Sequence, residues 1–380
     1  MRTDEVVALL LDPPSISELT GREAVVSRLR IKPGVSVVAA LADARTGATD
    51  GWARVLWPAS RAKTEKAEER AVRRGQRYRL RSLGGDLVLE SGEVWADPVL
   101  AGALRGAARA GVLGVDDPVL RYNPARRLVV RRAATTVRVA DGVDPAALAL
   151  DRALVAAGVP VPGRIDDGSR RGVRIQRFVG DTDLEQAPDA AGTRAAGVAL
   201  ALLHAAVGAV PVEVAGVVAA RQPDLAAQGR AHAGILAPLD AGLASRMVAL
   251  TGRVVGAWAP VAASSARVGR GGALLHGDFT PDQVLLERQT GRVWLTDLDR
   301  ATLDAPAADL GSYLASAAPG PGEALLNGYR AGGGRIPGDA ELRAGRARAV
   351  LLGAVDPLRR ADPGWRAGVA GRLDILEDLV

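Results

Sequence analysis

The segment LLHGDFTPDQVLLERQTGRVWLTDLDRA, residues 274–301, decides how we interpret this chain. Its first apolar letters predict a short strand that ends at HGD, and the following proline marks a tight turn. The apolar runs VLL and VWLTDL are separated by the turn residues RQTG, so they predict a β-hairpin. The segment therefore predicts that Asp278, Gln283 and Asp297 stand at the ends of adjacent strands.

Two carboxylates and one carboxamide in such an arrangement can converge on one point. Hard oxygen ligands of this kind suit Mg²⁺. A carboxylate on a loop beside them suits activation of a hydroxyl nucleophile. The spacing also fits the phosphoryl-transfer template, in which a loop acid is followed five residues later by an amide and then by a downstream strand acid. Here Asp278, Gln283 and Asp297 have that order.

The composition narrows the possible classes of protein. The chain has 380 residues, of which 48% are hydrophobic and 24% charged, which is typical of a folded protein with two or three subdomains. Cysteine is absent, so disulfides, thiolate nucleophiles and zinc–thiolate sites are excluded. No apolar run reaches 18 residues and the N-terminal run VVALLL is too short for a signal peptide, so we expect a cytoplasmic protein without a membrane span.

The charge raises the question of a nucleic-acid partner. The formal net charge is +6, but acidic residues are interspersed throughout and aromatic residues make up 3% of the chain, which leaves few stacking platforms. We therefore expect no nucleic-acid partner, although a basic RNA-binding protein stays an alternative that salt-dependent retention on a polyanion would reveal. Of the 49 basic residues, only Lys32, Lys63 and Lys66 are lysines.

Three blocks follow one another along the chain. We expect residues 1–115 to form an N-terminal cap or extension, residues 116–184 a small β-rich lobe with a hinge, and residues 185–380 a mainly helical lobe with the catalytic loop. LRIKPGVSVV at 29–38 resembles LRYNPARRLVV at 120–130, and both predict a strand, a proline turn and a strand. Duplication of a hairpin and coincidence in a chain rich in Val and Arg explain the similarity equally well.

The pattern HGDF…Q…L…DLDRA…AADLGSYLA resembles the aminoglycoside phosphotransferase and choline kinase-like superfamily. His204 in VALALLHAA, the segment RFVGDTDL at 177–184 and Asp309 in AADLGSYLA extend the resemblance over about residues 116–330. It implies an α+β, bilobal protein-kinase-like fold with a β-rich N-terminal part and a mainly helical C-lobe. The matches at His204, at residues 177–184 and at Asp309 are weak when taken alone. The pair Asp278 and Asp297 at this spacing is a fairly specific sign of the superfamily.

The resemblance also implies roles for individual residues. Asp278 would be the catalytic base, while Asp297 and Gln283 would hold Mg²⁺ on the phosphates of ATP. Phe178 and Val179, at the hinge, would contact the nucleotide. Three further polar residues are expected to be structural: His204 packed or hydrogen-bonded in the core, His276 orienting the loop, and Asp309 capping a helix or bracing the catalytic loop.

Two positions depart from the family pattern. The family usually has Asn at position 283; Gln carries the same carbonyl on a longer arm, and maltokinase-type members look similar. The strand lysine that holds the phosphates has no counterpart, because TTVRVADG places Arg138 there. Arginine keeps the charge but not the shape of lysine. The next helix has no Glu, so Asp151 is the nearest acid that could pair with Arg138.

These observations predict an ATP-dependent small-molecule kinase, a phosphotransferase that uses ATP and Mg²⁺. Its acceptor would be a hydroxyl of a sugar, amino sugar, aminoglycoside or amino alcohol. A pseudokinase or nucleotide-binding module without transfer activity stays the alternative, because of the change at Arg138. Arg126 and Arg127, in the turn after Asn123, would either reach phosphate or face solvent. We expect a monomer or a homodimer.

Overall fold

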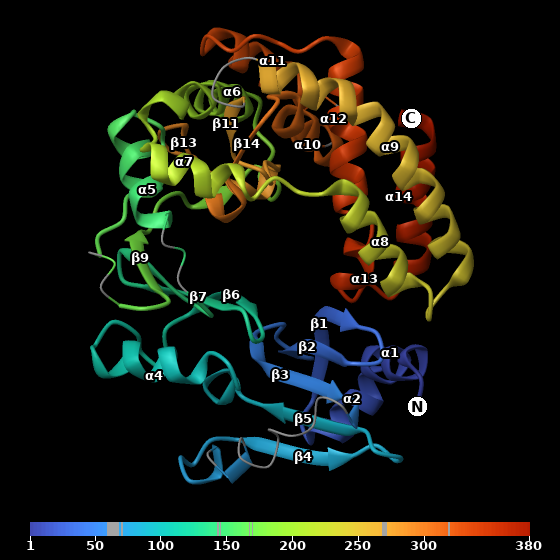
Figure 1. Cartoon of the computed structure of the whole chain (residues 1–380). Coiled ribbons are helices and arrows are strands. Elements are labelled where there is room, and N and C mark those ends of the chain that lie inside the picture. Colours follow the sequence, from blue (N-terminus) through green and yellow to red (C-terminus); the bar gives the residue numbers. More distant parts are fainter. Residues whose placement is uncertain are drawn as a thin grey trace.

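The structure is a computed structural model that describes residues 1–58, 68–69, 71–142, 144, 146–166, 168, 170–267, 272–317 and 320–380. Two antiparallel sheets make up most of the first half of the chain, and helices make up most of the second half (Figure 1). The predicted α+β class, with a β-rich N-terminal part and a helical C-lobe, is confirmed.

The first sheet has five antiparallel strands in the order β1-β2-β3-β5-β4. Two helices precede it, and the second begins at an Asp12 side chain that accepts from the Ser15 backbone N–H, with prolines in its first turn. The elements of this region are α1 (Thr3–Leu11), α2 (Pro13–Thr20), β1 (Ala24–Lys32), β2 (Ser36–Asp43), β3 (Thr49–Leu56), β4 (Tyr78–Ser82), β5 (Val88–Gly92), η2 (Val94–Ala96) and α4 (Ala101–Arg109).

Strand β1 has one apolar and one basic face. Leu29 and Ile31 are buried in a core that also contains residues of α1 and of the C-terminal helices. Arg28 and Arg30 alternate with them and therefore point to the opposite face of the strand. A β-bulge between Val26 and Arg28 interrupts the pairing with β2 at this point.

The second sheet has four antiparallel strands in the order β6-β7-β8-β9. Its elements are β6 (Val119–Asn123), β7 (Arg127–Arg132), β8 (Thr135–Ala140) and β9 (Val173–Arg177), with α5 (Ala147–Ala156) between the last two strands. A core that contains Trp52, Leu104 and Leu128 joins this sheet to the first one through α4. Both proline hairpins predicted from the sequence are present, as β1–β2 and β6–β7.

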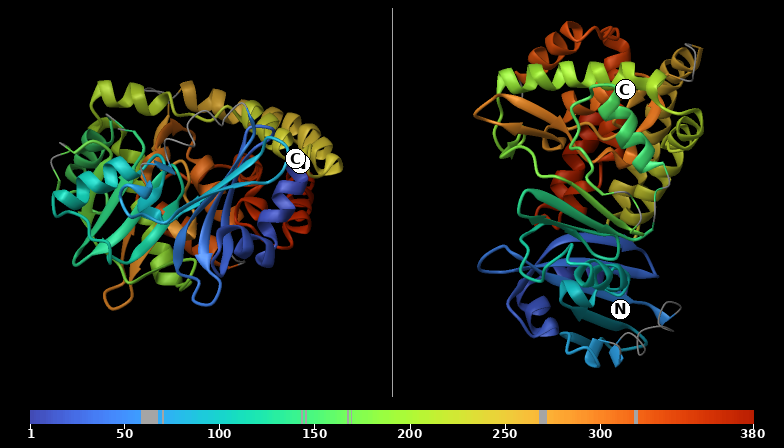
Figure 2. Two further views of the ribbon diagram at one scale, coloured as in Figure 1. Left: turned by 90° about the horizontal axis from the view of Figure 1, so that it is seen from below. Right: turned by 90° about the vertical axis from the view of Figure 1, so that its left-hand side faces the viewer.

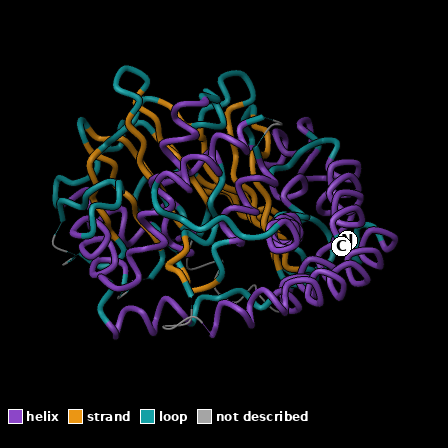
Figure 3. Tube along the Cα trace, turned by 90° about the horizontal axis from the view of Figure 1, so that it is seen from above, coloured by secondary structure: helices purple, strands orange, loops and turns teal. Residues whose placement is uncertain are grey.

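The remaining chain is mostly helical and carries two small sheets. Its helices are α6 (Ala190–Ala205), η3 (Ala206–Ala209), α7 (Val212–Ala219), α8 (Leu225–Leu236), α9 (Ala241–Arg267), α10 (Ala307–Ser316), α11 (Pro321–Ala331), α12 (Asp339–Leu352), α13 (Asp356–Arg359) and α14 (Trp365–Leu379). Viewed from above, helices line the edge on which the C-terminus lies, and strands occupy the other side (Figure 3). The second sheet lies between the first sheet and the helical part (Figure 2, right).

The segment 274–301 forms the predicted strands, but their pairing differs from the prediction in one respect. The hairpin consists of β12 (Val284–Glu287) and β13 (Arg292–Leu295), and β10 (Thr182–Asp183) pairs with β12. The strand before Asp278, β11 (Ala273–Leu275), pairs instead with β14 (Thr302–Asp304) in a separate sheet. The strand pairing therefore does not meet the expectation that Asp278 and Asp297 follow adjacent strands, because β11, before Asp278, pairs with β14, whereas β13, before Asp297, pairs with β12.

Two stretches of helix are long and apolar enough to span a membrane by length and composition. They cover 190–209, with a mean hydropathy of 1.4, and 241–265, with a mean hydropathy of 1.2. More than half of the first window, 56%, is buried inside the fold. Core helices of globular proteins meet the same criterion, so the absence of a membrane partner stays a prediction.

Candidate active site

Asp278 lies on the loop that follows β11. Its Oδ2 lies 3.1 Å from Nη1 of Arg300, and 44% of its side chain is exposed. Shielding from solvent raises the pKa of Asp278; Arg300 and His276 lower it, and the carboxylates of Asp297 and Asp282 raise it. A partly exposed carboxylate with a raised pKa can hydrogen-bond a substrate hydroxyl and accept its proton.

The backbone of this loop is fixed by a buried carboxylate. Asp309, in the first turn of α10, accepts hydrogen bonds from the backbone N–H groups of His276 (2.6 Å) and Gly277 (2.9 Å). Gly277 has a φ of +81°, and a Cβ there would lie 2.1 Å from the carbonyl oxygen of Arg300, so no other residue fits. The predicted role of Asp309 as a brace of the catalytic loop is confirmed.

Both histidines predicted to be structural are part of the same arrangement. His204 is buried, with Nε2 3.1 Å from Oδ2 of Asp309 and Nδ1 2.8 Å from the hydroxyl of Tyr329. His276 places Nε2 2.7 Å from the carbonyl oxygen of Thr296, which ties the loop to the end of β13. Burial acts to raise the pKa of Asp309, but the hydrogen bond and charge of His204 outweigh it and hold that pKa below its ordinary value.

Asp297 follows β13 in a left-handed backbone conformation, with a φ of +59°. Arg127, at the start of β7, donates Nη1 to one carboxylate oxygen and Nη2 to the other, both at 2.8 Å. Burial acts to raise the pKa of Asp297, but this bidentate pair holds it well below its usual range. The prediction that Arg127 either reaches phosphate or faces solvent is thus replaced by an ion pair with the predicted metal ligand.

Asp299, two residues further on, is the partner of the arginine that replaces the family lysine. Arg138 donates both terminal nitrogens to Asp299, one of them at 2.6 Å to Oδ1. Arg127 and Arg174 lie 3.2 and 3.7 Å from the same carboxylate. Asp151, which the sequence offered as the partner of Arg138, pairs instead with Arg164 and Arg174, at 3.7 and 3.9 Å.

The oxygen atoms of Asp297 and Gln283 are of the kind that bind Mg²⁺, but Arg127 is paired with Asp297 in this structure. Gln283 lies in η4 (Pro281–Gln283), buried, and donates its Nε2 to Asp282 at 2.7 Å, so its amide group is oriented. Its carbonyl oxygen and the carboxylate of Asp297 are ligands that Mg²⁺ accepts. Within the described residues, no three His, Asp or Glu side chains already form a metal-holding group. Arg127 therefore competes with a metal ion for the oxygens of Asp297.

Comparison with known proteins decides the family. A sequence model described as the phosphotransferase enzyme family matches residues 114–346, which is more than half of the chain. The chain belongs to this phosphotransferase family. Membership confirms the predicted superfamily and the predicted enzyme class, a phosphotransferase with an alcohol group as acceptor. It does not favour the pseudokinase alternative.

One solved structure supports the fold of this phosphotransferase, and others are similar at lower scores. A choline/ethanolamine kinase family protein from Mesorhizobium loti is 21% identical, with a TM-score of 0.51 over 73% of this chain and 93% of that one. A macrolide 2'-phosphotransferase from Brachybacterium faecium is 22% identical, with a TM-score of 0.44 over 72% and 98% of the two chains. An ethanolamine kinase from Plasmodium vivax is 12% identical, with a TM-score of 0.46 over 72% and 87%. No curated protein sequence matches.

The hinge of the phosphotransferase connects β9 to β10. The backbone N–H of Phe178 donates to the carbonyl oxygen of Ala134 at 2.9 Å, and the guanidinium of Arg131 lies 4.1 Å from the centre of its ring. Val179 follows in the same connection between the small sheet and the helical part. Contact of Phe178 and Val179 with a nucleotide stays a prediction.

Sequence reasoning missed a buried acid that holds the β6–β7 turn. Asp97 accepts from the hydroxyl of Tyr122 and from the backbone N–H of Ala125, both at 2.7 Å. Its other oxygen accepts from the N–H groups of Val99 and Leu100. Ala125 has a left-handed φ of +56°, so Asp97 stabilises a strained turn directly before Arg127. The turn is thereby tied to the N-terminal region.

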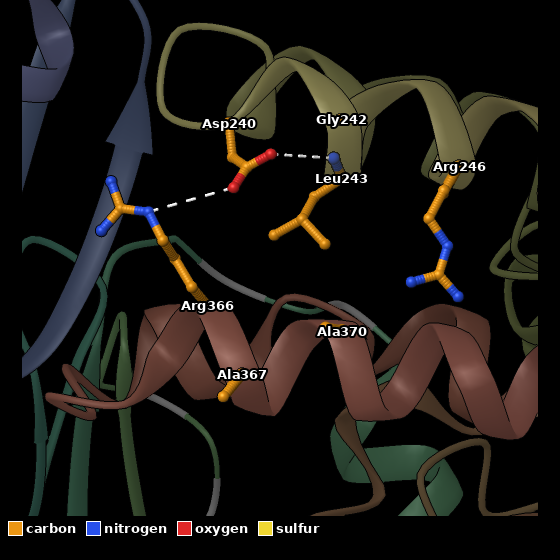
Figure 4. Close-up of a pocket in the computed structure, with 7 residues that line it drawn as sticks. All are labelled: Asp240, Gly242, Leu243, Arg246, Arg366, Ala367 and Ala370. Atoms are coloured by element: carbon orange, nitrogen blue, oxygen red, sulfur yellow. Dashed lines mark hydrogen bonds and ion pairs between the residues drawn. The ribbon is translucent and has the colours of Figure 1, made fainter.

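A groove between α9 and α14 shares no residue with the catalytic segment (Figure 4). Asp240 accepts from the backbone N–H of Leu243 on one side of it and lies 4.0 Å from Arg366 on the other. Gly242, Arg246, Ala367 and Ala370 complete its lining. Elsewhere in the C-terminal helices, Asp224 caps α8 and Asp374 pairs with Arg246 at the surface.

Proposed function

We propose that this phosphotransferase is an ATP-dependent small-molecule kinase. The hydroxyl oxygen of the acceptor attacks the γ-phosphorus of ATP, the bond from that phosphorus to the β,γ-bridging oxygen breaks, and ADP leaves with the electron pair. Asp278 orients the hydroxyl and accepts its proton, which later passes to solvent. The products are a phosphate monoester, ADP and a proton, so charge and atoms balance.

The observation that carries this proposal is the way Asp278 is presented. The side chain is partly exposed at the end of a loop whose backbone is fixed by Asp309 and whose imidazole, His276, is anchored to Thr296. A loop held from both sides positions its carboxylate before substrate binds, and such positioning is the main contribution that a protein makes to phosphoryl transfer.

Asp297 and Gln283 are the residues that would hold Mg²⁺, and the bound ion would offset negative charge on the phosphates. Arg127 pairs with Asp297, and Arg138 pairs with the neighbouring Asp299. When the triphosphate arrives, each of them can exchange a carboxylate partner for phosphate oxygens, which suit bidentate guanidinium contacts equally well.

A screen for acceptor-stimulated ADP release tests the proposal. Purified full-length protein is supplied with ATP and Mg²⁺ and with hydroxylated compounds, including sugars, sugar phosphates, sugar acids, amino sugars, amino alcohols and aminoglycosides. We expect at least one class to stimulate ADP release above the rate without acceptor. Binding of ATP with no stimulation by any class would support the nucleotide-binding alternative instead.

A further inference from the structure

Four arginines have no acidic partner among the residues that the structure describes. Arg28 and Arg30 come from β1, Arg121 from β6, and Arg126 from the β6–β7 turn; we call them the arginine cluster. No guanidinium group of the four forms a hydrogen bond or ion pair with any residue in the described part of the chain. Arg28 and Arg30 are half-buried, and Arg121 and Arg126 are exposed.

The members of the cluster lie close enough to affect one another. Burial lowers the pKa of Arg28, and the charges of Arg121, Arg127 and Arg359 lower it further, while Asp356 opposes them. Burial likewise lowers the pKa of Arg30, and the charge of Arg126 adds to the effect. Helix α13, which carries Arg359, packs against β1, which carries Arg28 (Figure 1).

The cluster extends to the catalytic loop. Burial lowers the pKa of Arg126, and the charges of Arg359, Arg300 and Arg127 lower it further. Arg300 is the ion-pair partner of Asp278. A path of neighbouring cations thus runs from the catalytic carboxylate through the β6–β7 turn to the basic face of β1.

The acids in this region do not neutralise the cluster, because each has its own partner. Asp278 pairs with Arg300, Asp297 with Arg127, Asp299 with Arg138 and Asp356 with Arg359. Asp97, whose charge acts on Arg30, already accepts four hydrogen bonds. Half-buried guanidinium groups without a counter-charge are costly unless a ligand supplies one.

Two members of the cluster, Arg28 and Arg30, lie on a different sheet from the cations expected to meet the triphosphate. The cations expected to meet the triphosphate, Arg127 and Arg138, lie on β7 and β8 of the second sheet. Arg28 and Arg30 lie on β1 of the first sheet, which packs against α13, the helix that carries Arg359. Arg121 and Arg126 lie on β6 and in the turn before Arg127, and so connect β1 to the second sheet.

We propose that the arginine cluster binds an anionic group of the acceptor, so that the substrate is a hydroxylated phosphate ester or carboxylate rather than a polycation. This inference rests on the proposed kinase function and narrows it. Guanidinium groups bind phosphate and carboxylate oxygens in pairs, whereas a cationic aminoglycoside or amino alcohol would be repelled. The acceptor hydroxyl lies at Asp278 and its anionic group reaches Arg126 and Arg28.

Matched acceptors and matched variants test this inference. Binding to the nucleotide-free protein is measured by calorimetry for glucose, glucosamine, gluconate and glucose 6-phosphate, for glycerol and glycerol 3-phosphate, and for inorganic phosphate. Arg28→Gln and Arg126→Gln each remove one charge of the cluster. Arg45→Gln, on the exposed β2–β3 turn, removes the same charge outside it.

We expect the anionic member of each series to bind about tenfold or more tightly than the neutral or aminated one. Arg28→Gln and Arg126→Gln should weaken anion binding by about tenfold, and Arg45→Gln by less than about twofold. Tighter binding of glucose or glucosamine, or equal binding of the anions to wild type and cluster variants, would overturn the inference.

Turnover separates this inference from the proposed function. If ADP release is stimulated best by a neutral or cationic compound, the kinase proposal stands and the anionic acceptor is wrong. If both cluster variants weaken ATP binding but leave binding of the sugar phosphates unchanged, the cluster serves the nucleotide and the inference is again wrong. Specific anion binding that both variants abolish, without ADP release from any compound, would support the anion site and overturn the kinase.

Discussion

Arg127 donates both terminal nitrogens to the two carboxylate oxygens of Asp297, at 2.8 Å each. The guanidinium therefore stands where the sequence predicts a divalent cation. Arg127 comes from the small sheet and Asp297 from the end of β13, so the pair also joins the two parts of the molecule. Metal and Arg127 compete for one ligand.

This competition predicts that Arg127→Ala raises the affinity of the nucleotide-free protein for a divalent cation. Without the guanidinium, both oxygens of Asp297 are free, and metal binding no longer has to break an ion pair. Mn²⁺ binding, followed by the loss of the electron paramagnetic resonance signal of free Mn²⁺, should strengthen by about tenfold. Arg132→Ala, on the same strand but paired with Asp117, serves as the control. Unchanged Mn²⁺ affinity in Arg127→Ala would show that the pair does not block the ligand.

The ion pair between Arg300 and Asp278 predicts a change in pH dependence. Arg300 lowers the pKa of Asp278, so Arg300→Gln should raise that pKa further. Because the base must be deprotonated to act, the acidic limb of the kcat/KM profile should move to higher pH. The same profile is recorded for Arg292→Gln, which removes an exposed arginine from β13 and should leave the limb in place. A shift to lower pH in Arg300→Gln would be incompatible with this role.

The buried brace predicts a large loss of stability for Asp309→Asn. The carboxylate accepts from two backbone N–H groups and lies beside His204, so we expect a loss of roughly 3 kcal/mol in the free energy of unfolding. Urea unfolding of wild type and variant measures it. Tyr329→Phe, which removes the hydroxyl beside His204, should cost about 1 kcal/mol.

The same residue gives a pH test with a defined sign. Folding lowers the pKa of Asp309 below its ordinary 3.8, so its contribution is fully present above that value and is lost as the pH falls through the folded-state pKa. The difference in stability between wild type and Asp309→Asn should therefore shrink on acidification below 3.8. A constant difference would mean that the charge of Asp309 contributes nothing.

The turn before Arg127 should become more mobile in Tyr122→Phe. The variant removes one of the four hydrogen bonds to buried Asp97, at a cost of about 1 kcal/mol. Amide hydrogen exchange should rise in residues 123–127, because the left-handed Ala125 relies on the same carboxylate. Tyr313→Phe, whose hydroxyl lies 3.4 Å from Thr193, should leave exchange in this turn unchanged. Faster exchange there in both variants would point to a general loss of stability.

Local patterns made the strands and the catalytic loop predictable. Turn residues and apolar runs in 274–301 identify three strands, and the order of Asp278, Gln283 and Asp297 predicts phosphoryl-transfer chemistry without reference to the rest of the fold. The roles of His204 and Asp309 as structural residues were predicted in the same way and are confirmed by their hydrogen bonds. The division of the chain at 115 and 184 stays a prediction.

Partners that lie far apart in the sequence could not be predicted. Arg127 and Asp297 are separated by 170 residues, and the local sequence does not show which of the many arginines pairs with Asp297. Asp151 is the nearest acid in the sequence that could pair with Arg138, but the fold brings Asp299 to it instead. The spacing of Asp297 and Asp299 was the available signal for a second acid in the site. The basic face of β1 gave no signal, because alternating arginines are common on exposed strands.

The most direct test of the account is phosphoryl transfer by Asp278→Asn. With γ-labelled ATP, Mg²⁺ and the best acceptor of the screen, the label should move to the acceptor in wild type and in Glu287→Gln, a control at the half-buried end of β12. Asp278→Asn should lower the rate by about 10²- to 10⁴-fold while it still binds ATP. Transfer at the wild-type rate by Asp278→Asn would contradict the assignment of Asp278 as the base and, with it, the proposed mechanism.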